Sequence, residues 1–535
     1  MRRLRTRVKT LAGMTGYSDR FLAMRAIRQN LRNAMIRLSS LLAVFGIGLM
    51  IISPLLLLWH PDWMSFQSIL ASDGMFDGFI LYGLKGLPLG LLLAGSFLVL
   101  ASVVVYIMER KAGKLLEYST RTFLTALIII KMCLCLITIG VTPYNIGKYD
   151  AYSNFHYAKN LAEGEPVVSP EGRPTAWWPI GYPLLLSLFF RILGVKVWVA
   201  QVINAGILTL TMVLTFYWVR DLMGIRIAQK AALVLTLLPS QTFYAVPLMS
   251  DMFFGLLLLA LLWVITKKAT GYNASLAGLL LGLAMLTRPT LLFFPLVLLL
   301  YRLVRDKDWK RALVHAVIII LAAEAVLLPW QIRNYRLFHQ FVLVSTNGGH
   351  HLWMGNNPQA RGGFLPVEWH ATRQQLKYMS TLSEAEADRY ALRQGLNYIA
   401  QHPLQAIQVW PKKLFYLLFK DSRSVATAIA DTHIKIAPAV IIGMLGATEG
   451  FYTAVLLCFF LSWVALIRRE RASPRNVLLS GTVLYFLMIT VAFIAEGRYH
   501  QPLVPIFVLL AVWNPSTPSE EQAAAAGLES VHPAA

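Results

Sequence analysis

The stretch that decides the fold is FLTALIIIKMCLCLITIGVT, residues 123–142, an apolar run that contains one charged side chain, Lys131. A helix of about 20 residues crosses the hydrocarbon core of a bilayer, which is roughly 30 Å thick. Because the run is apolar throughout instead of alternating, it predicts a transmembrane helix and not a strand of a membrane barrel. Runs of similar length recur at Leu41–Trp59, Leu87–Met108 and Val197–Trp218.

The composition of the whole chain agrees with this prediction. Of its 535 residues 57% are hydrophobic and 14% are charged, whereas soluble domains carry about a quarter charged residues. The net charge of +22 does not indicate a nucleic-acid partner, because the basic residues cluster between apolar runs, where they set membrane orientation. The three cysteines all lie in apolar segments, which excludes a disulfide framework.

The distribution of basic residues gives the chain a direction in the membrane. Residues 1–40 hold ten Lys and Arg against one acid, Asp19, which places the N-terminus inside. Threading the chain from there through about twelve spans puts every short basic loop on the inner side and both termini inside. The later spans include Ala231–Val246, Phe451–Ile467 and Leu503–Trp513. The apolar segment Pro179–Gly194 is then a helix at the outer interface, since counting it as a span would invert every later segment.

We therefore predict an all-α polytopic membrane protein, a bundle of about twelve transmembrane helices with long outer loops that carry interfacial helices. The expected parts are a basic amphipathic cytoplasmic segment (1–40), an N-terminal transmembrane hairpin (41–121), a catalytic membrane core (122–333) with a first outer loop (143–196), an outer region with interfacial helices (334–449), C-terminal transmembrane helices (450–513) and a disordered cytoplasmic tail (514–535).

The threading collects two acids and three arginines on the outer face, namely Asp150, Asp251, Arg288, Arg333 and Arg498. Taken singly, an arginine at the end of a span can reach lipid headgroups, and an acid before a span can cap its helix. Together they favour a reactive face, because guanidinium groups offer paired donors to phosphate and a carboxylate can take a proton from an acceptor. The combination predicts a phosphate-bearing donor and a carboxylate-assisted transfer.

Several motifs then show a family resemblance. The first outer loop, residues 150–164 (DAYSNFHYAKNLAEG) and 178–186 (WPIGYPLLL), resembles that of glycosyltransferase family 39, which includes protein O-mannosyltransferases and lipid A aminoarabinose transferases. The resemblance continues, in family order, through residues 286–289 (LTRP), 329–334 (PWQIRN), 355–358 (GNNP) and 498–502 (RYHQP). The chain departs from many relatives in having Trp178-Pro179 in place of Pro-Pro, and it has the extra hairpin.

This resemblance implies a GT-C membrane enzyme that takes a sugar from a polyprenyl-phosphate carrier and inverts its anomeric centre. It implies that Asp150 is the catalytic carboxylate, to which we add Asp251, and that Arg288, Arg333 and Arg498 bind the donor phosphate. Substrate contacts are expected within or beside the motifs, at Lys148, Tyr152, Tyr182, Asn356 and Tyr499.

No cofactor or metal site is expected, although a divalent metal stays possible. The expected partners are the lipid-linked donor, a lipid, glycan or protein acceptor, and the bilayer, with the active site on the periplasmic side of a bacterial inner membrane. Two other functions fit the same outer face: a transporter or flippase of lipid-linked sugars, and a lipid-linked polysaccharide polymerase or ligase. A transporter often shows repeats of its span pattern, and none is found in this sequence.

Three further features have both structural and functional readings. Asp306-Lys307-Asp308 has the Asp-x-Asp pattern of metal-dependent glycosyltransferases, but it lies in a basic inner loop. His350-His351 is a pair without a third ligand at useful spacing. Lys131 and Glu324 are intramembrane charges that can pair with each other.

Overall fold

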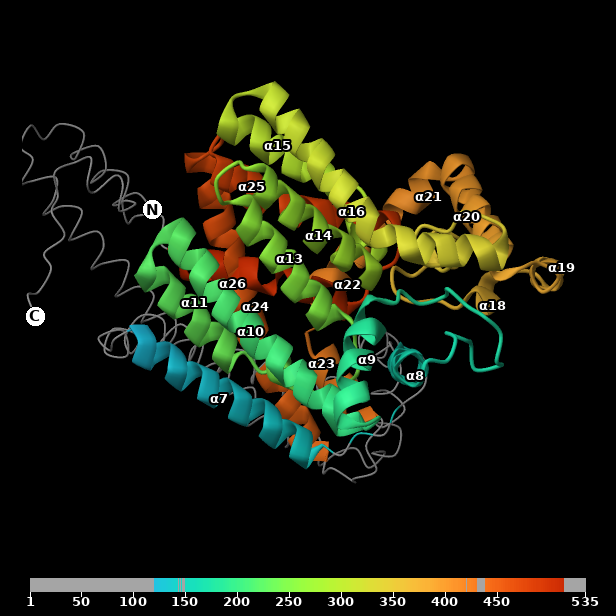
Figure 1. Cartoon of the computed structure of the whole chain (residues 1–535), viewed down its shortest axis with the longest axis horizontal. Coiled ribbons are helices and arrows are strands. Elements are labelled where there is room, and N and C mark those ends of the chain that lie inside the picture. The colour runs from blue at the N-terminus through green and yellow to red at the C-terminus, as the bar shows by residue number, and fades with distance from the viewer. Residues whose placement is uncertain are drawn as a thin grey trace, which may run out of the picture.

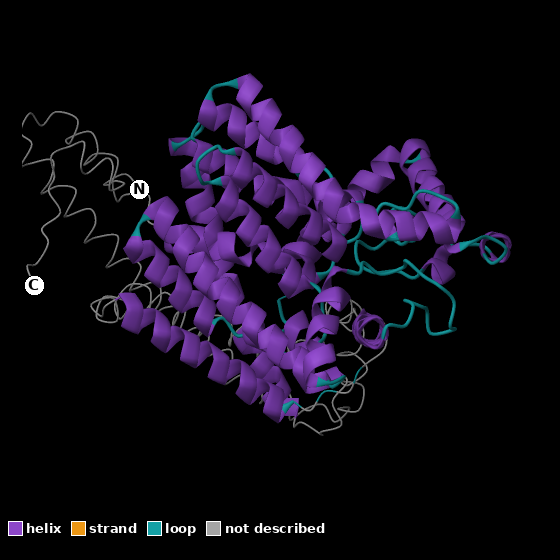
Figure 2. Cartoon of the chain, viewed as in Figure 1, coloured by secondary structure: helices purple, strands orange, loops and turns teal. Residues whose placement is uncertain are grey.

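The structure is a computed structural model that describes residues 120–142, 144, 146, 150–419, 421–430 and 438–513. Within these ranges the regular elements are helices (Figure 2), and an isolated β-bridge joins Val168 to Pro174. The predicted cytoplasmic segment 1–40, nearly all of the hairpin 41–121, the tail 514–535 and Lys148 lie outside the described residues. The all-helical prediction is confirmed for the part that the structure describes.

Five helices are long and apolar enough to cross a membrane. They are α7 (Thr120–Val141), α10 (Val197–Met223), α16 (Trp309–Phe338), α24 (Pro438–Arg469), whose apolar part is Ile441–Arg469, and α25 (Pro474–Ala492). Three shorter apolar helices accompany them, α9 (Gly181–Leu193), α13 (Asp251–Ile265) and α14 (Gly271–Thr287). Large apolar side chains such as Ile137, Leu321 and Leu461 are exposed on the long helices, as expected where lipid is the solvent. The chain is an integral membrane protein, and these helices do not confirm the predicted number of about twelve spans.

The remaining elements connect or flank these helices (Figure 1). Their bounds are α8 (Asp150–Glu163), α11 (Ile225–Leu237), α12 (Ser240–Phe243), η4 (Pro289–Leu291), α15 (Pro295–Asp306), α17 (Gly348–Gly355), α18 (Val367–His370), α19 (Arg373–Met379), α20 (Glu384–Gln401), α21 (Pro403–Gln408), α22 (Trp410–Leu418), α23 (Arg423–Ala430), η5 (Gly497–Leu503) and α26 (Val504–Val512).

Prolines shift several boundaries away from the predicted ones. The expected span Ala231–Val246 is divided, because α11 ends before Pro239 and the short α12 follows. Proline lacks a backbone N–H and clashes with the preceding turn, so it ends a helix more readily than hydropathy suggests. Conversely, α24 begins at Pro438, well before the expected start at Phe451, since proline is well accommodated in a first helical turn.

The centre of the bundle is formed by helices that are apolar on every side. All nine residues of α26 are buried, as expected for a helix without a polar face. The neighbouring α13 is buried along most of its length, and it packs beside η5 and α14. Both helices begin at the same end of the bundle, so residues at their N-termini are held by well-buried helices.

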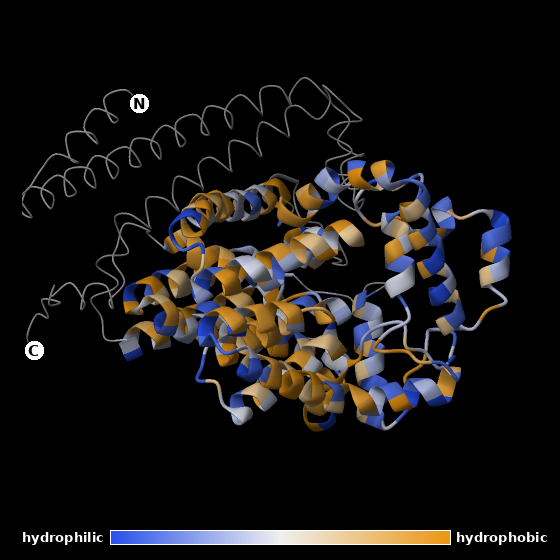
Figure 3. Cartoon of the chain, turned by 90° about the horizontal axis from the view of Figure 1, so that it is seen from above, coloured by the Kyte–Doolittle hydropathy of each residue, from blue (hydrophilic) through white to orange (hydrophobic). Residues whose placement is uncertain are grey.

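A more polar layer lies beside this bundle and contains α17 to α21. Capping boxes begin α19, at Thr372 and Gln375, and α20, at Ser383 and Glu386, a pattern that satisfies free N–H groups at a helix start. Figure 3 shows hydrophilic residues concentrated here and hydrophobic residues in the bundle. The segment Pro179–Gly194 contains the predicted helix, α9, and its position at the outer interface stays a prediction.

Candidate active site

The two predicted acids each begin a helix at the same end of the bundle. Asp150 is the first residue of α8, and Asp251 is the first residue of α13. A carboxylate in the first turn of a helix is stabilised by the partial positive charge of the free N–H groups. The two differ in access, since the side chain of Asp251 is 1% exposed and that of Asp150 is 18% exposed.

Arg498 joins these acids from the turn η5. Its Nη1 atom lies 2.5 Å from Oδ2 of Asp150 and 3.9 Å from Oδ2 of Asp251. Its Nε donates to Glu496 at 2.6 Å, and its side chain is 10% exposed. One guanidinium therefore connects three carboxylates, and charge-assisted bonds of this kind are among the stronger ones in proteins.

Arg288 completes the cluster from the end of α14. Its Nη1 donates to Oδ1 of Asp251, and its guanidinium lies 4.6 Å from the ring centroid of Tyr499. Tyr499 is also 5.6 Å from the guanidinium carbon of Arg498, so one ring supports both arginines by cation–π contact. Four of the five charged residues predicted for the outer face, Asp150, Asp251, Arg288 and Arg498, are thus brought together.

Side-chain amides fix the loop that leads to Asp251. Gln201 donates to the carbonyl of Val246, Asn204 to that of Pro247, and Asn154 to that of Leu248, at 2.9 to 3.1 Å. Buried carbonyls outside regular structure need such partners. These bonds place the N-terminus of α13 against α8 and α10.

Two glycines allow the motifs around the cluster to approach closely. A Cβ atom on Gly181 would lie 2.7 Å from the backbone nitrogen of Thr287, next to Arg288. A Cβ atom on Gly355 would lie 2.0 Å from the carbonyl oxygen of Phe493, in the turn that leads to Glu496. Glycine is required where backbones meet at such distances. The motifs that resemble the family therefore converge on one place. They are residues 178–186, 286–289, 355–358 and 498–502.

Charge pairing controls ionisation in the cluster. Burial alone would lower the pKa of Arg498, but Asp150 and Glu496 outweigh it and raise the pKa well above its usual value. Burial would raise the pKa of Glu496, but Arg498 and Arg423 outweigh it, so the pKa lies below its usual value. Burial raises the pKa of Tyr499 to about 12. At neutral pH the cluster thus holds charged Arg498 and Glu496 beside a neutral phenol.

Arg333 does not join the cluster. Its guanidinium donates to the carbonyls of Thr175 at 2.8 Å and Val167 at 3.1 Å, and it stacks on Trp330 at 4.5 Å. These bonds attach the first outer loop to α16. This placement does not favour the predicted phosphate-binding role, because Nη1 and Nη2 both donate to backbone carbonyls.

The predicted substrate contacts are divided in the same way. Tyr499 lies in the cluster, and Tyr152 lies on α8 with its ring centroid 3.9 Å from that of His156 and the two rings tilted by 38°. Tyr182 is fully buried and donates to Asn204 at 2.8 Å. Asn356 is also buried and donates to the carbonyl of Ala492 at 2.8 Å. The last two side chains are used for packing, which does not favour contact with a substrate.

Three residues near the cluster were not predicted as site residues. Glu496 lies two positions before Arg498 and pairs with it, so its neighbour in sequence was the available signal. Arg423 of α23 contributes positive charge at Glu496. His351 of α17 lies within electrostatic range of Glu496 and Asp150, and burial lowers its pKa to about 4. Because Arg423 and His351 lie far from Arg498 in the sequence, no local sequence pattern indicates that they lie near it.

A buried polar network supports the turn from behind. His500 places Nδ1 2.6 Å from the carbonyl of Leu417 and Nε2 3.1 Å from Asp421, and Gln501 donates to Asp421 at 2.6 Å. Asp421 and His500 are fully buried. Since these partners come from the end of α22 and the residues just after it, the position of Arg498 depends on that region.

The features with two readings have structural roles in this structure. Asp308 caps α16 by accepting from the N–H groups of Lys310 and Arg311. His350 lies 3.1 Å from Asp388. Lys131 donates to the carbonyl of Leu235 and the hydroxyl of Thr242, while Glu324 is exposed on α16, so the two do not form an ion pair. Among the described residues, no group of three or more His, Cys, Asp and Glu could hold a metal ion.

Comparison with solved structures finds distant matches. The oligosaccharyltransferase of Archaeoglobus fulgidus in its apo form is 13% identical, with a TM-score of 0.46, over 74% of this chain and 50% of that one. ArnT from Cupriavidus metallidurans, solved with undecaprenyl phosphate, is 14% identical, with a TM-score of 0.38, over 74% of this chain and 78% of that one. This chain thus spans about half the length of the archaeal enzyme. A comparison with curated protein sequences gave no match.

Comparison with protein-family models gives one match, over residues 178–330, to the dolichyl-phosphate-mannose-protein mannosyltransferase family. The matched segment contains Asp251 and Arg288 and runs from the motif at Trp178 to Trp330. It therefore includes two of the residues that form the cluster. The resemblance predicted from the motifs is confirmed, and this chain is similar to the dolichyl-phosphate-mannose-protein mannosyltransferases, a family of membrane glycosyltransferases.

Proposed function

We propose that this chain is a membrane glycosyltransferase that transfers a sugar from a polyprenyl-phosphate carrier to an acceptor on the outer face of the membrane. The observation that carries the proposal is the pairing of Asp150, a partly exposed carboxylate, with Arg498 in a cluster that also holds Arg288 and Asp251. The family match supports the class of donor, because its name specifies a sugar carried on a polyprenyl phosphate.

In the proposed reaction, Asp150 accepts the proton of an acceptor hydroxyl or amine while that atom attacks the anomeric carbon of the sugar. The bond between this carbon and the phosphate oxygen breaks, and the lipid phosphate leaves with its electron pair. Attack opposite to the leaving group inverts the anomeric centre. Asp150 is suited to this role because it is more exposed than Asp251, and a positioned base typically contributes about 10²- to 10⁴-fold to the rate.

Arg288 and Arg498 would stabilise the leaving phosphate, since fixed donors in a site of low dielectric constant lose little energy to reorganisation. Arg498 would have a second role, because it is paired with Asp150 at 2.5 Å. When Asp150 takes the proton its negative charge disappears, and its attraction for Arg498 weakens. Proton transfer therefore releases a guanidinium at the moment when charge develops on the phosphate.

Asp251 and Glu496 would hold the two arginines in position. Asp251 bonds to Arg288 and lies close to Arg498, and Glu496 bonds to Arg498. We therefore revise the predicted role of Asp251 from a catalytic acid to a positioning residue. We also propose that transfer needs no metal ion, so that activity should persist when EDTA is added, and that the reaction occurs on the periplasmic side of a bacterial inner membrane.

The test is mass spectrometry of lipids and glycans from a strain in which the gene is deleted and then replaced by variants. The parent gene and Asp308→Asn, a matched change of an exposed acid at the other end of the bundle, should restore the missing sugar. Asp150→Asn should be made and inserted but should not restore it, and the unused polyprenyl-phosphate sugar should accumulate. Transfer by Asp150→Asn at the parent rate would contradict the proposal.

A further inference from the structure

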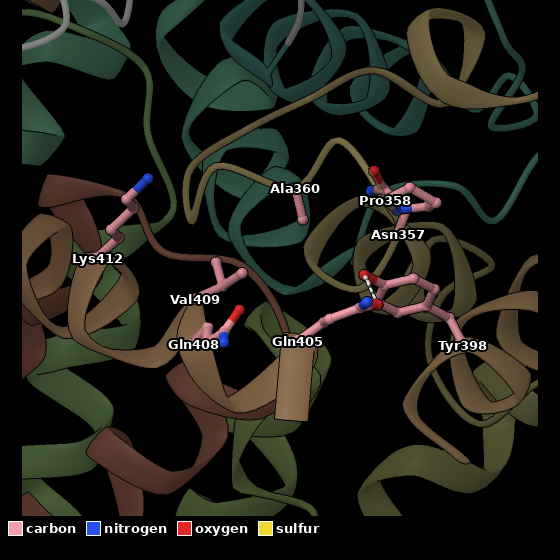
Figure 4. Close-up of a pocket in the computed structure, with 8 residues that line it drawn as sticks. All are labelled: Asn357, Pro358, Ala360, Tyr398, Gln405, Gln408, Val409 and Lys412. Carbon is pink, nitrogen blue, oxygen red and sulfur yellow. Dashed lines mark hydrogen bonds between the residues drawn. The ribbon is translucent and has the colours of Figure 1, made fainter. Parts of the chain in front are cut away.

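The polar layer outside the bundle contains a cavity of about 340 Å³, which lies within the range of about 300–1,000 Å³ typical of small-molecule sites. It lies between the loop that follows α17 and the helices α20, α21 and α22 (Figure 4). Its lining includes Asn357, Pro358, Tyr398, Gln405, Gln408 and Lys412. The first two residues belong to the motif 355–358, which the reaction proposed above leaves without a role.

The chemistry of the lining selects a class of ligand. No carboxylate lines the cavity, and its one charged residue is Lys412, so a cationic ligand is disfavoured. Gln405 and Gln408 each offer an amide with two donors and an acceptor, which matches the hydroxyl groups of a sugar. Tyr398 adds a partly buried ring with a polar tip, on which the C–H face of a sugar ring can pack.

The polar groups divide into those that build the cavity and those that a ligand can engage. Asn357 is 2% exposed, and its amide donates to the carbonyls of Trp353 and Met354, so it fixes the wall. Gln405 and Gln408 are exposed. The hydroxyl of Tyr398 donates to Gln405 at 3.4 Å, a long hydrogen bond that a ligand can replace at little cost.

The wall of this cavity is bonded to the segment that leads into the cluster. Asn356 donates to the carbonyl of Ala492 at 2.8 Å, and the N–H of Ala495 donates to the carbonyl of Gly362 at 3.0 Å. Ala495 directly precedes Glu496, which holds Arg498. The loop that lines the cavity is therefore bonded on both sides, at Asn356 and Gly362, to the segment that leads to the arginine contacting Asp150.

We propose that this cavity is a subsite for a neutral sugar unit of the acceptor, and hence that the acceptor is a glycan or glycolipid. The inference rests on the proposed function. The position of the cavity favours the acceptor over the donor, because it lies in the hydrophilic layer that Figure 3 shows beside the bundle, whereas the donor lipid belongs in the membrane.

The test uses the full chain in lipid nanodiscs and saturation-transfer NMR with methyl β-D-glucopyranoside and N,N′-diacetylchitobiose as probes. The double variant Gln405→Leu, Gln408→Leu should weaken binding of at least one probe by about tenfold, as expected when amide partners of sugar hydroxyls are removed. Gln401→Leu, which changes an exposed glutamine at the end of α20 outside the lining, is the matched control and should bind as the parent does.

The outcomes separate this inference from the proposed function. Equal binding by the double variant and the parent, or no binding of either probe, would overturn the subsite. Binding that is retained in Asp150→Asn and lost in the double variant would support it. If the parent binds sugar in this way but transfers none to any acceptor, the subsite stands and the proposed function fails. Transfer to a bare peptide at the same rate in the double variant would overturn the subsite and leave the transferase intact.

Discussion

Replacing Asp251 by asparagine should destabilise the protein much more than the same change at Asp150. Asp251 is 1% exposed, bonds to Arg288 and lies 3.9 Å from Arg498. Its replacement leaves Arg288, whose side chain is 19% exposed, without the buried carboxylate that pairs with it. Breaking a buried pair costs about 3–5 kcal/mol, and because water reaches Arg288 we expect the lower end, about 3 kcal/mol. Asp150 is 18% exposed, and without it Arg498 keeps Glu496 at 2.6 Å, so the cost should be about 1 kcal/mol, as for pairs that water can reach.

The assay is thermal unfolding of the purified variants in one detergent, followed by tryptophan fluorescence, with transfer activity measured on the same samples. Asp251→Asn should show the lower unfolding temperature, and Asp150→Asn should lose activity while unfolding close to the parent. The double variant Asp251→Asn, Arg288→Gln removes both charges, and it should recover part of the loss, with a coupling of about 0.5–3 kcal/mol between neighbours. Equal unfolding temperatures for the two asparagine variants would refute the assignment of Asp251 as the buried positioning acid.

Three further predictions concern the surroundings of the cluster. Arg333→Lys keeps the charge but loses the forked bonds to the loop carbonyls, so limited proteolysis should cut residues 164–180 faster than in the parent. Arg498→Lys should abolish transfer without faster cutting. The reverse pattern would restore Arg333 as the phosphate ligand. Gly181→Ala should lower stability by about 1–3 kcal/mol through overpacking against Thr287. The control is Gly206→Ala, whose added Cβ meets nothing within 4 Å, and its unfolding temperature should equal or exceed that of the parent. Equal unfolding temperatures for the two variants would contradict the close approach at Gly181. Desolvation lowers the pKa of His351 from 6.5 to about 4, so the folded state binds fewer protons than the unfolded chain. Stability should be full above about pH 6.5 and fall as pH decreases toward 4. Unfolding temperatures measured across this range should fall less steeply for His351→Gln, and parallel curves for this variant and the parent would contradict the lowered pKa of His351.

Hydropathy predicted the helices well because a bilayer requires continuous apolar segments whose backbone bonds are internal. Each predicted span among the described residues, from Phe123–Thr142 to Leu503–Trp513, overlaps a helix. The errors arise where local chemistry overrides hydropathy. Pro239 divides one expected span into α11 and α12, and the helix that contains Phe451 begins at Pro438, within the segment predicted as an outer loop.

The charge pattern predicted that the charged residues of the cluster would share one face but did not predict their pairing. Threading by basic loops assigns Asp150, Asp251, Arg288 and Arg498 to one side, and the structure brings these four together. Which acid is buried depends on the packing of the elements that meet there, which no local pattern contains. The same holds for His351 and Arg423, whose proximity to Glu496 results from helices that are far apart in the sequence.

Arg333 and Arg498 show why a sequence pattern alone cannot separate a structural arginine from a reactive one. Arg333 lies in the last turns of α16 and Arg498 in the turn after α25. Each lies in a motif that resembles the family. Arg333 lies beside the first outer loop, and its guanidinium donates to two backbone carbonyls there, those of Thr175 and Val167. Arg498 ends beside three carboxylates, where a guanidinium stays charged and can move to a new anion once one carboxylate is protonated. The acceptors around an arginine, more than its place at the end of a helix, decide whether it holds the fold or serves the reaction.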